Sequence, residues 1–351
     1  MRLEIIKPFD AHAHLRSGSV LRAVLPLAAR QFARVVAMPN LAPPLTSAAM
    51  VRAYRDEILL ACREKHLTVE PVMSLYLTDN TSPGDLETGF REGIIRLAKL
   101  YPAGATTNSD SGVTSLKKIF PVLDKMQRLG IVLSVHGEVN DPDVDVFDRE
   151  AVFIDRVLAP LRRDFPALKI VFEHLTTRKA VEFVLGEGGK GTTGATITAH
   201  HLRITRNDML SGGLKPHYYC MPVAKTESDR QALIKAAVSG NPAFFAGTDS
   251  APHPRTAKEC ASGAAGCFTH ADALALYAQT FDEAGALNML ESFASLNGPT
   301  FYGLAMADNP VTLERSGLPQ EEIKPILTSD GAEIVPFRDK KPVYWRLMER
   351  P

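Results

Sequence analysis

The stretch LEIIKPFDAHAH, residues 3–14, decides the fold of this chain, because it joins an apolar run to a pair of histidines. Residues i and i+2 of a β-strand point to the same face of a sheet. His12 and His14 can therefore converge on one ion at the carboxyl end of a strand, which we expect over residues 3–11. An isolated pair of this kind arises easily by chance, so the interpretation depends on the rest of the chain.

Short runs rich in β-branched residues recur along the sequence, and helical patterns separate them. The predicted strands cover residues 3–11, 34–38, 69–77, 94–100, 131–135, 169–172, 195–199 and 244–247. The amphipathic stretches between them include residues 47–65, 115–129, 148–165, 177–185 and 227–239. Eight strand-then-helix repeats without a low-complexity linker predict a (β/α)8 barrel, an α/β fold that forms a single domain over residues 1–351. A doubly wound open sheet is the alternative.

The positions of the reactive side chains favour the barrel over the open sheet. Each such residue falls in or directly after a predicted strand, and the set consists of His12, His14, Asn40, Lys99, His136, His174 and Asp249. In a barrel the carboxyl ends of all strands share one rim, whereas the outermost strands of an open sheet lie far apart. A single metal-sized site therefore requires closure.

The region after the eighth strand is less regular. Residues 269–284 and 287–293, with the turn Asn297-Gly298-Pro299, predict extra C-terminal helices packed outside the barrel. The tail over residues 334–346 is interrupted by proline and poorly periodic, and it has no functional interpretation.

The composition excludes several classes of function. The formal net charge is zero, so no basic surplus points to nucleic acid or to an anionic membrane. No apolar stretch approaches about 18 residues, the length that would predict a membrane span. The four cysteines show no CxxC pairing and are too few for a disulfide scaffold, so we expect a cytoplasmic protein.

The predicted rim residues have the chemistry of a metal site. Neutral imidazoles and a carboxylate suit Zn²⁺ and neighbouring divalent ions. Lys99 is the exception, because a protonated amine is repelled by cations. Reaction of that amine with CO2 would give a carbamate, an anion with two oxygens that can bridge two metals.

Several motifs together resemble the short bacterial type of the dihydroorotase family within the amidohydrolase superfamily. They run from the first strand to at least Gly303, and the most specific are DAHAHLR (10–16), MPN (38–40), AKLYP (98–102), ATTNS (105–109), VHGE (135–138), FEHLTT (172–177) and GTDSAPH (247–253). The resemblance implies a metal-dependent hydrolase that reversibly converts N-carbamoyl-L-aspartate into dihydroorotate in pyrimidine biosynthesis.

The resemblance also implies the cofactors. Two Zn²⁺ ions per subunit are expected, one held by His12, His14 and Asp249 and the other by His136 and His174. Carboxylated Lys99 and a hydroxide would bridge them. Asp249 would in addition be the catalytic residue that carries a proton.

The same resemblance assigns the substrate contacts. Arg16, Asn40 and His253 would bind the substrate carboxylate, with main-chain help near Met221 and Ala265. Arginine suits this role because its planar fork donates two parallel hydrogen bonds. Thr106 and Thr107 lie on a segment over residues 104–113 that resembles the family's mobile loop, and a homodimer is implied.

Some features depart from the family or stay open. The stretch after His253 has fewer cysteines than is usual, so a metal role for Cys260 and Cys267 is unsupported, and Met221 replaces a more usual leucine. His200 and His201, at the end of the predicted seventh strand, are left as structural residues or as neighbours of the metal ligands. Glu173 is a candidate for orienting a ligand imidazole.

Two alternative functions remain at this point. A hydantoinase or allantoinase would keep the metal ligands and change the substrate pocket, and the combination of Arg16, Asn40 and His253 argues against it. A catalytically silent barrel that serves as a binding partner would be marked by lost metal ligands, and the sequence retains all of them.

Overall fold

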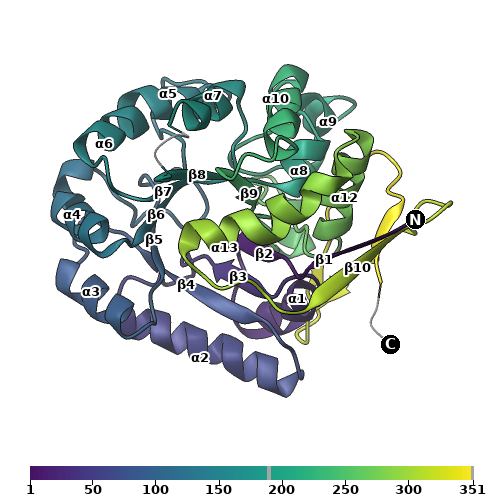
Figure 1. Ribbon diagram of the computed structural model, residues 1–351, viewed down its shortest axis with the longest axis horizontal. Helices are drawn as coiled ribbons and strands as arrows, with labels where there is room; N and C mark the ends of the chain where they lie inside the picture. The colour runs from purple at the N-terminus through teal and green to yellow at the C-terminus, as the bar shows by residue number, and fades with distance from the viewer. Residues whose placement is uncertain (188–190, 349–351) are drawn as a thin grey trace.

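The computed structural model describes residues 1–187 and 191–348. Within these ranges eight parallel strands form one sheet in sequential order, surrounded by helices (Figure 1). These strands are β2 (Phe9–Ala13), β3 (Arg34–Ala37), β4 (Glu70–Tyr76), β5 (Leu97–Leu100), β6 (Val132–Val135), β7 (Ile170–Phe172), β8 (Thr193–Ile197) and β9 (Phe244–Ala246).

The sheet closes between its first and last strands. A parallel bridge joins Ala13 of β2 to Ser250, which follows β9. On either side of this bridge, the Asp249 amide donates to the His12 carbonyl at 2.8 Å and the His14 amide donates to the Ser250 carbonyl at 3.0 Å. The predicted (β/α)8 barrel is confirmed, and the open-sheet alternative is wrong.

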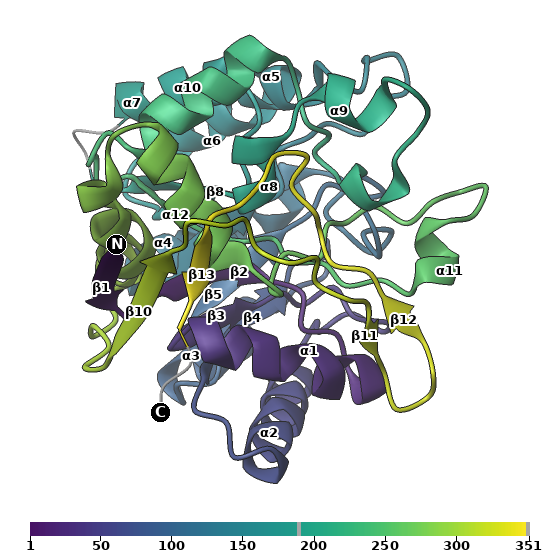
Figure 2. The same ribbon diagram turned by 90° about the vertical axis from the view of Figure 1, so that its right-hand side faces the viewer.

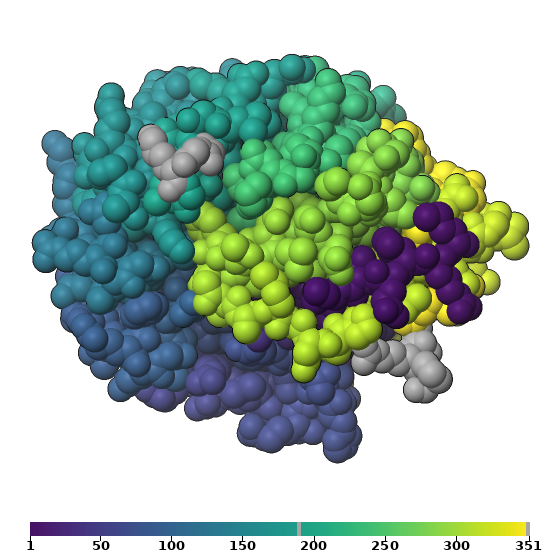
Figure 3. All heavy atoms as spheres, in the orientation of Figure 1, coloured from purple at the N-terminus to yellow at the C-terminus, as the bar shows by residue number. Residues whose placement is uncertain are grey.

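The first predicted strand, over residues 3–11, is wrong as a single element. Residues Arg2–Ile6 form β1, which pairs with β10 (Pro310–Arg315), and β10 in turn pairs with β13 (Trp345–Leu347) in a separate antiparallel sheet (Figure 2). The chain changes partners at Pro8, which has no N–H to donate to a ladder. The poorly periodic tail therefore supplies an edge strand, and β1 lies on the surface beside C-terminal residues (Figure 3).

The interior of the barrel is filled from its amino-terminal end. Tyr302, the last residue of α13 (Asn297–Tyr302), lies with its ring 5.6 Å from that of Phe9 and its hydroxyl 3.4 Å from Ser134 of β6. These partners come from separate strands, so the tyrosine plugs the barrel. The expected Asn297-Gly298-Pro299 turn thus begins a helix that closes one end, which corrects the prediction that the late helices pack only outside. The reactive rim is left at the other end.

The predicted amphipathic stretches are helices with recognisable caps. Ser47 caps α2 by accepting from the Met50 amide at 3.3 Å, and Thr226 and Asp229 form a capping box at α10. The longer helices are α1 (Gly18–Gln31), α2 (Ala48–Glu64), α3 (Pro83–Arg91), α4 (Phe120–Leu129), α7 (Arg178–Glu187), α10 (Glu227–Ala237) and α12 (Ala273–Glu283). The stretch 148–165 is one continuous run of α5 (Arg149–Phe153), the π-helix η2 (Ile154–Leu158) and α6 (Ala159–Asp164).

The remaining elements are short connections. They are the helical turns η1 (Leu116–Ile119), α8 (Ala199–Arg203), α9 (Arg206–Leu210), η3 (Pro216–Tyr218), α11 (Arg255–Lys258), η4 (Leu287–Met289) and η5 (Ser292–Leu296), and the hairpin strands β11 (Ile326–Leu327) and β12 (Glu333–Ile334). In the described parts of the chain, no helix has both the length and the apolar character needed to cross a membrane.

Apart from the first, two predicted strands differ from the observed ones by more than one residue at an end. The fourth begins at Leu97 rather than at residue 94, because the amides of Ile94 and Ile95 both bond to the Gly89 carbonyl at the end of α3. The seventh ends at Ile197, because the Thr198 side chain accepts from the His201 amide and starts α8. His200 and His201 therefore belong to a short helix and not to a strand end.

Candidate metal centre and substrate cavity

The carboxyl ends of the barrel strands bring the predicted rim residues together. One enclosed cavity there is lined by His12, His14, Arg16, Asn40, Tyr101, Thr106, Thr107, His136, His174, Met221, Asp249, Ala251, Ala265 and Gly266. Of the residues predicted for the site, only Lys99 and His253 are not in this lining. Lys99 is buried in β5 beneath it, and His253 packs behind Arg16.

The tightest group in the cavity consists of His12, His14 and Asp249. The carboxylate oxygen Oδ1 of Asp249 lies 3.2 Å from His12 Nε2 and 3.0 Å from His14 Nε2, and the two nitrogens are 3.3 Å apart. The backbone here is strained, since Asp249 has φ +45° in the left-handed region. Such strain concentrates at functional sites, where the surrounding structure holds it in place.

Glu173 connects this group to the buried lysine. Its Oε1 atom lies 3.2 Å from His12 Nδ1, and its other oxygen contacts Lys99 Nζ inside the barrel. The contact with Nδ1 leaves Nε2 of His12 facing Asp249. The glutamate is therefore placed to orient a ligand-type imidazole, although the contact does not meet hydrogen-bond geometry in this structure.

His136 and His174 form the opposite side of the cavity. Their ring centroids are 4.9 Å apart, and the His174 ring lies 5.2 Å from that of His12. His136 Nε2 lies 3.1 Å from the buried carboxylate of Glu138. His12, Glu173 and His174 also place ligand atoms within 4.8 Å of one another, so Glu173 is close enough to compete for a cation.

Burial sets the protonation of this cluster. It lowers the pKa of His12, His136 and His174, and it lowers the pKa of His14 to about 4, so all four imidazoles are neutral near pH 7. Burial would raise the pKa of Asp249, but its contacts with the two histidines outweigh burial and hold that pKa well below its usual range. The cluster therefore presents neutral nitrogens and a carboxylate.

This donor set fits divalent metal ions. Neutral imidazole and carboxylate are the ligands that Zn²⁺ takes in catalytic sites. The Nδ1 atoms of His14 and His174 are buried and have no hydrogen-bond partner among the described residues, which is unusual for polar atoms. Burial also lowers the pKa of Lys99 well below its usual value, which favours the neutral, nucleophilic form of its amine.

The proposed carboxylate-binding residues lie beside the metal-type cluster. The guanidinium of Arg16 contacts His253 Nε2 at 3.0 Å and donates from Nε to the Pro252 carbonyl at 3.2 Å. The Tyr54 hydroxyl donates to the Arg16 carbonyl at 2.6 Å, and Arg16 itself has φ +59°. The positively charged guanidinium of Arg16 is thus held in place at the cavity wall.

The loop that carries Thr106 and Thr107 covers the cavity. Asn40 Nδ2 donates to the Thr107 carbonyl at 3.0 Å, and Asn108 Nδ2 donates to the Asn40 carbonyl at 3.1 Å. The cavity beneath has a volume of about 20 Å³, room for about one water molecule. A larger hollow of about 470 Å³ is lined in part by Leu116, Val157 and Glu138, and the histidines of the cluster and Asp249 do not line it.

Three side chains near the cluster were not assigned a role from the sequence. Tyr101 lines the cavity with its hydroxyl unpartnered within the described ranges, and Glu138 contacts His136. His270 is buried, with its Nε2 atom 2.7 Å from Asp10. Asp10 in turn accepts a hydrogen bond from the amide of Thr248, the residue before Asp249. Of these three, only Glu138 could have been proposed from the sequence, because it lies two residues after the predicted ligand His136.

Folding stability should depend on pH through His253. Burial and the nearby Arg16 charge lower its pKa from 6.5 to about 3. Below pH 6.5 His253 therefore binds a proton in the unfolded chain but stays neutral in the folded chain. The free energy of unfolding consequently decreases as the pH falls. Between pH 7.5 and 5 this contributes up to about 2 kcal/mol, and His253→Asn should remove that part of the slope.

Urea unfolding of the chelator-treated protein across this pH range measures the effect. His66→Asn is the matched control, because His66 is exposed and asparagine tolerates its φ of +53°. Equal slopes for His253→Asn and the parent chain would contradict the prediction.

A closed parallel barrel that gathers imidazoles and a carboxylate at the carboxyl ends of its strands is the architecture of the metal-dependent amidohydrolases. A dihydroorotase from Cupriavidus necator is 54% identical to this chain over 347 residues, which cover 98% of each chain. A dihydroorotase from Azoarcus sp. is 53% identical over 341 residues, which cover 97% of this chain and 98% of the relative. The chain belongs to the dihydroorotase family.

Solved structures agree with this assignment. A dihydroorotase from Saccharomyces cerevisiae, crystallised with 5-fluoroorotic acid, superposes with a TM-score of 0.89 at 32% identity, and the match covers both chains completely. One from Campylobacter jejuni gives 0.89 at 35% identity, covering 99% of this chain and 98% of that one. An L-hydantoinase from Arthrobacter aurescens, at 15% identity and a TM-score of 0.77 over 92% of this chain and 78% of its own, shares the fold. No protein-family model matches the chain.

Proposed function

We propose that this chain is a zinc-dependent dihydroorotase that interconverts N-carbamoyl-L-aspartate and dihydroorotate. The observation that carries the proposal is one cavity in which Arg16 and Asn40 face the cluster of His12, His14 and Asp249. Hydrolysis of a cyclic amide that bears a carboxylate needs two features: a positively charged side chain that binds the carboxylate, and a metal site that activates water.

The residues fit two Zn²⁺ ions. His12, His14 and Asp249 would hold one, His136 and His174 the other, and carboxylated Lys99 would contact both. When bound, the ions would polarise the amide carbonyl and make a water molecule nucleophilic at neutral pH. Glu173 would keep His12 oriented for its ion through the contact at Nδ1.

Lys99 would acquire its carboxylate from CO2. The neutral Nζ amine forms a bond to the carbon of CO2 and loses one proton, which leaves an anionic carbamate. Glu173 pairs with Nζ and is the nearest acceptor for that proton. Burial supports this step because it lowers the pKa of Lys99 and so favours the unprotonated amine.

The other side chains would bind substrate and move protons. Arg16, Asn40 and His253 would hold the substrate carboxylate, together with the main chain of Met221 and Ala265. Asp249 would accept a proton from the attacking water at Oδ1 and return it to the leaving ring nitrogen, and ring closure is the reverse of this path. We also propose that the enzyme works as a homodimer in the cytoplasm.

The loop over residues 104–113 would exclude water while the ring closes. Asn108→Gly keeps the positive φ of 54° but removes the hydrogen bond to the Asn40 carbonyl. A neutral hydrogen bond contributes about 0.5–1.5 kcal/mol, so KM should rise about 2- to 10-fold with a smaller change in kcat. Steady-state kinetics measure this, and Asp110→Ala, at an exposed neighbouring position, should leave KM unchanged. An unaltered KM in Asn108→Gly would count against the closing role.

Substrate preference tests the proposed function against the alternatives. Dihydroorotate should be hydrolysed, whereas hydantoin and allantoin, which lack the carboxylate, should not. Arg16→Gln should lose about 2–5 kcal/mol of transition-state binding, a fall in kcat/KM of roughly 30-fold or more. Activity confined to hydantoin or allantoin would support the other cyclic amidohydrolases. Zinc-free, inactive protein would support a silent barrel.

A further inference from the structure

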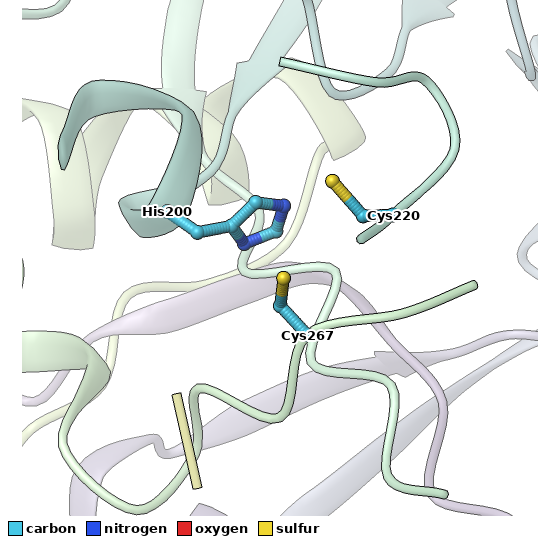
Figure 4. A group of neighbouring side chains, drawn as sticks. All are labelled: His200, Cys220 and Cys267. Atoms are coloured by element: carbon cyan, nitrogen blue, oxygen red, sulfur yellow. The ribbon is translucent and has the colours of Figure 1, made fainter. Parts of the chain in front are cut away.

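A second cluster of ligand-type side chains lies outside the active cavity. His200 of α8 and two cysteines from separate loops, Cys220 and Cys267, place a ring nitrogen and two sulfur atoms within 4.8 Å of one another. Figure 4 shows the imidazole directed between the two thiols. Their exposed fractions are 0%, 1% and 1%, so the cluster is closed to bulk solvent.

The imidazole of His200 stands out because neither of its ring nitrogens has a hydrogen-bond partner in the described part of the chain. The adjacent His201 is satisfied, with Nδ1 2.9 Å from Thr198 Oγ1 and Nε2 3.0 Å from the Pro222 carbonyl. Buried polar atoms are nearly always paired, and each exception requires an explanation. A ligand that binds between the three side chains supplies one.

We propose that His200, Cys220 and Cys267 bind a third Zn²⁺ ion, separate from the catalytic pair. Two thiolates and an imidazole are a donor set that zinc prefers in proteins. Binding would release one proton from each thiol, and the two thiolates would balance the charge of the ion. His201 would provide a fourth ligand only by giving up its bond to Pro222, so we assign three protein ligands and leave one position open.

The third site connects two segments that border the active cavity. Cys220 precedes Met221, and Cys267 follows Ala265 by two residues, so the proposed ligands flank both main-chain contacts to the substrate. The Ala251 amide donates to the Cys267 carbonyl at 2.8 Å, and Lys258 Nζ donates to carbonyls of both segments, those of Tyr219 and Gly266 among them. An ion bound here would fix the segment of Cys220 and Met221 relative to the segment of Ala265 and Cys267, without itself contacting the substrate.

Cobalt substitution tests the site in the intact protein. Protein stripped with a chelator and reloaded with Co²⁺ should show a sulfur-to-cobalt charge-transfer band, because the third site contains thiolates and the catalytic ligands contain none. Cys220→Ser and Cys267→Ser should each lose half of this band or more, and zinc-loaded His200→Asn should hold about one zinc fewer per chain than the parent. Cys62→Ser and Cys260→Ser, at a buried and an exposed cysteine, are the controls and should keep the band.

Two results would overturn the proposal. One is a cobalt-loaded parent protein without the charge-transfer band. The other is a band that persists in Cys220→Ser and disappears in Cys260→Ser, which would mark adventitious binding at the surface. If the cysteine variants do not fold, thiol labelling of the parent decides the matter. Two thiols should become reactive when a chelator removes the metal, and unchanged labelling would reject the site. None of these results depends on the substrate of the enzyme.

Discussion

Lys99→Ala is expected to lower kcat/KM for dihydroorotate by at least about 10³-fold and to reduce the zinc content of the purified protein. Lys99 lies fully buried in β5 and pairs with Glu173 directly beneath the cluster. Alanine removes the amine that would be carboxylated, and with it the anion proposed to contact both ions. Metal-ion catalysis supplies several kcal/mol, and about 4 kcal/mol corresponds to 10³-fold in rate. Steady-state kinetics and elemental analysis measure the two effects.

Chemical rescue separates loss of the carbamate from general damage to the barrel. The alanine variant leaves a buried space, and a small carboxylate such as acetate should occupy it and restore part of the zinc and of the activity. Lys99→Arg is the matched control, because a guanidinium stays protonated and cannot react with CO2. It should be inactive and should not respond to acetate. Full activity of Lys99→Ala without added carboxylate would refute the role of the lysine.

Asp249→Asn should lower kcat by about 10²- to 10⁴-fold, the range that general acid–base catalysis contributes. Asparagine has nearly the same shape, so the left-handed backbone and the contacts with His12 and His14 are largely kept. The amide cannot take up the proton that Asp249 would carry at Oδ1. The loss should therefore appear in kcat more than in KM, as the steady-state parameters for dihydroorotate would show.

Zinc content must be measured in the same preparations, since Asp249 is also proposed as a ligand. Asp229→Asn serves as the control, because it alters a capping box on α10 and should affect stability without changing kcat. If Asp249→Asn kept its zinc and turned over at the parental rate, another group would have to be the proton carrier.

The order of the barrel strands could be predicted from the sequence, whereas the partners of the outer strands could not. Parallel strands that alternate with helices have a local signature, and consecutive strands become neighbours. The split at Pro8 was missed because β1 pairs with β10, more than 300 residues away, and no local pattern encodes that pairing. α13 was likewise read as a turn, since Pro299 suits both a turn and the first turn of a helix.

The site could be anticipated where a residue type itself carries the chemistry. Histidines at strand ends indicate ligands, and the structure places them around one cavity, although their roles remain predictions. Tyr101 gave no signal, because an aromatic residue after a buried strand is usually packing. The cluster of His200, Cys220 and Cys267 was also missed, and the sequence pattern offered no support for a metal role of Cys267, because the three residues come from separate segments whose approach depends on the folded loops.

The closure between β2 and β9 has a consequence for how the enzyme withstands metal loss. His12 and His14 stand on one side of that junction and Asp249 on the other, where two backbone hydrogen bonds flank the bridge between Ala13 and Ser250. A metal ion bound by all three side chains would therefore link β2 to the segment that follows β9. By mass action, tighter binding of this ion would raise the free energy needed to open the barrel between β2 and β9. Depletion of zinc would then loosen the barrel first at the carboxyl end of this junction, whereas α13 packs against the same two strands at the other end of the barrel.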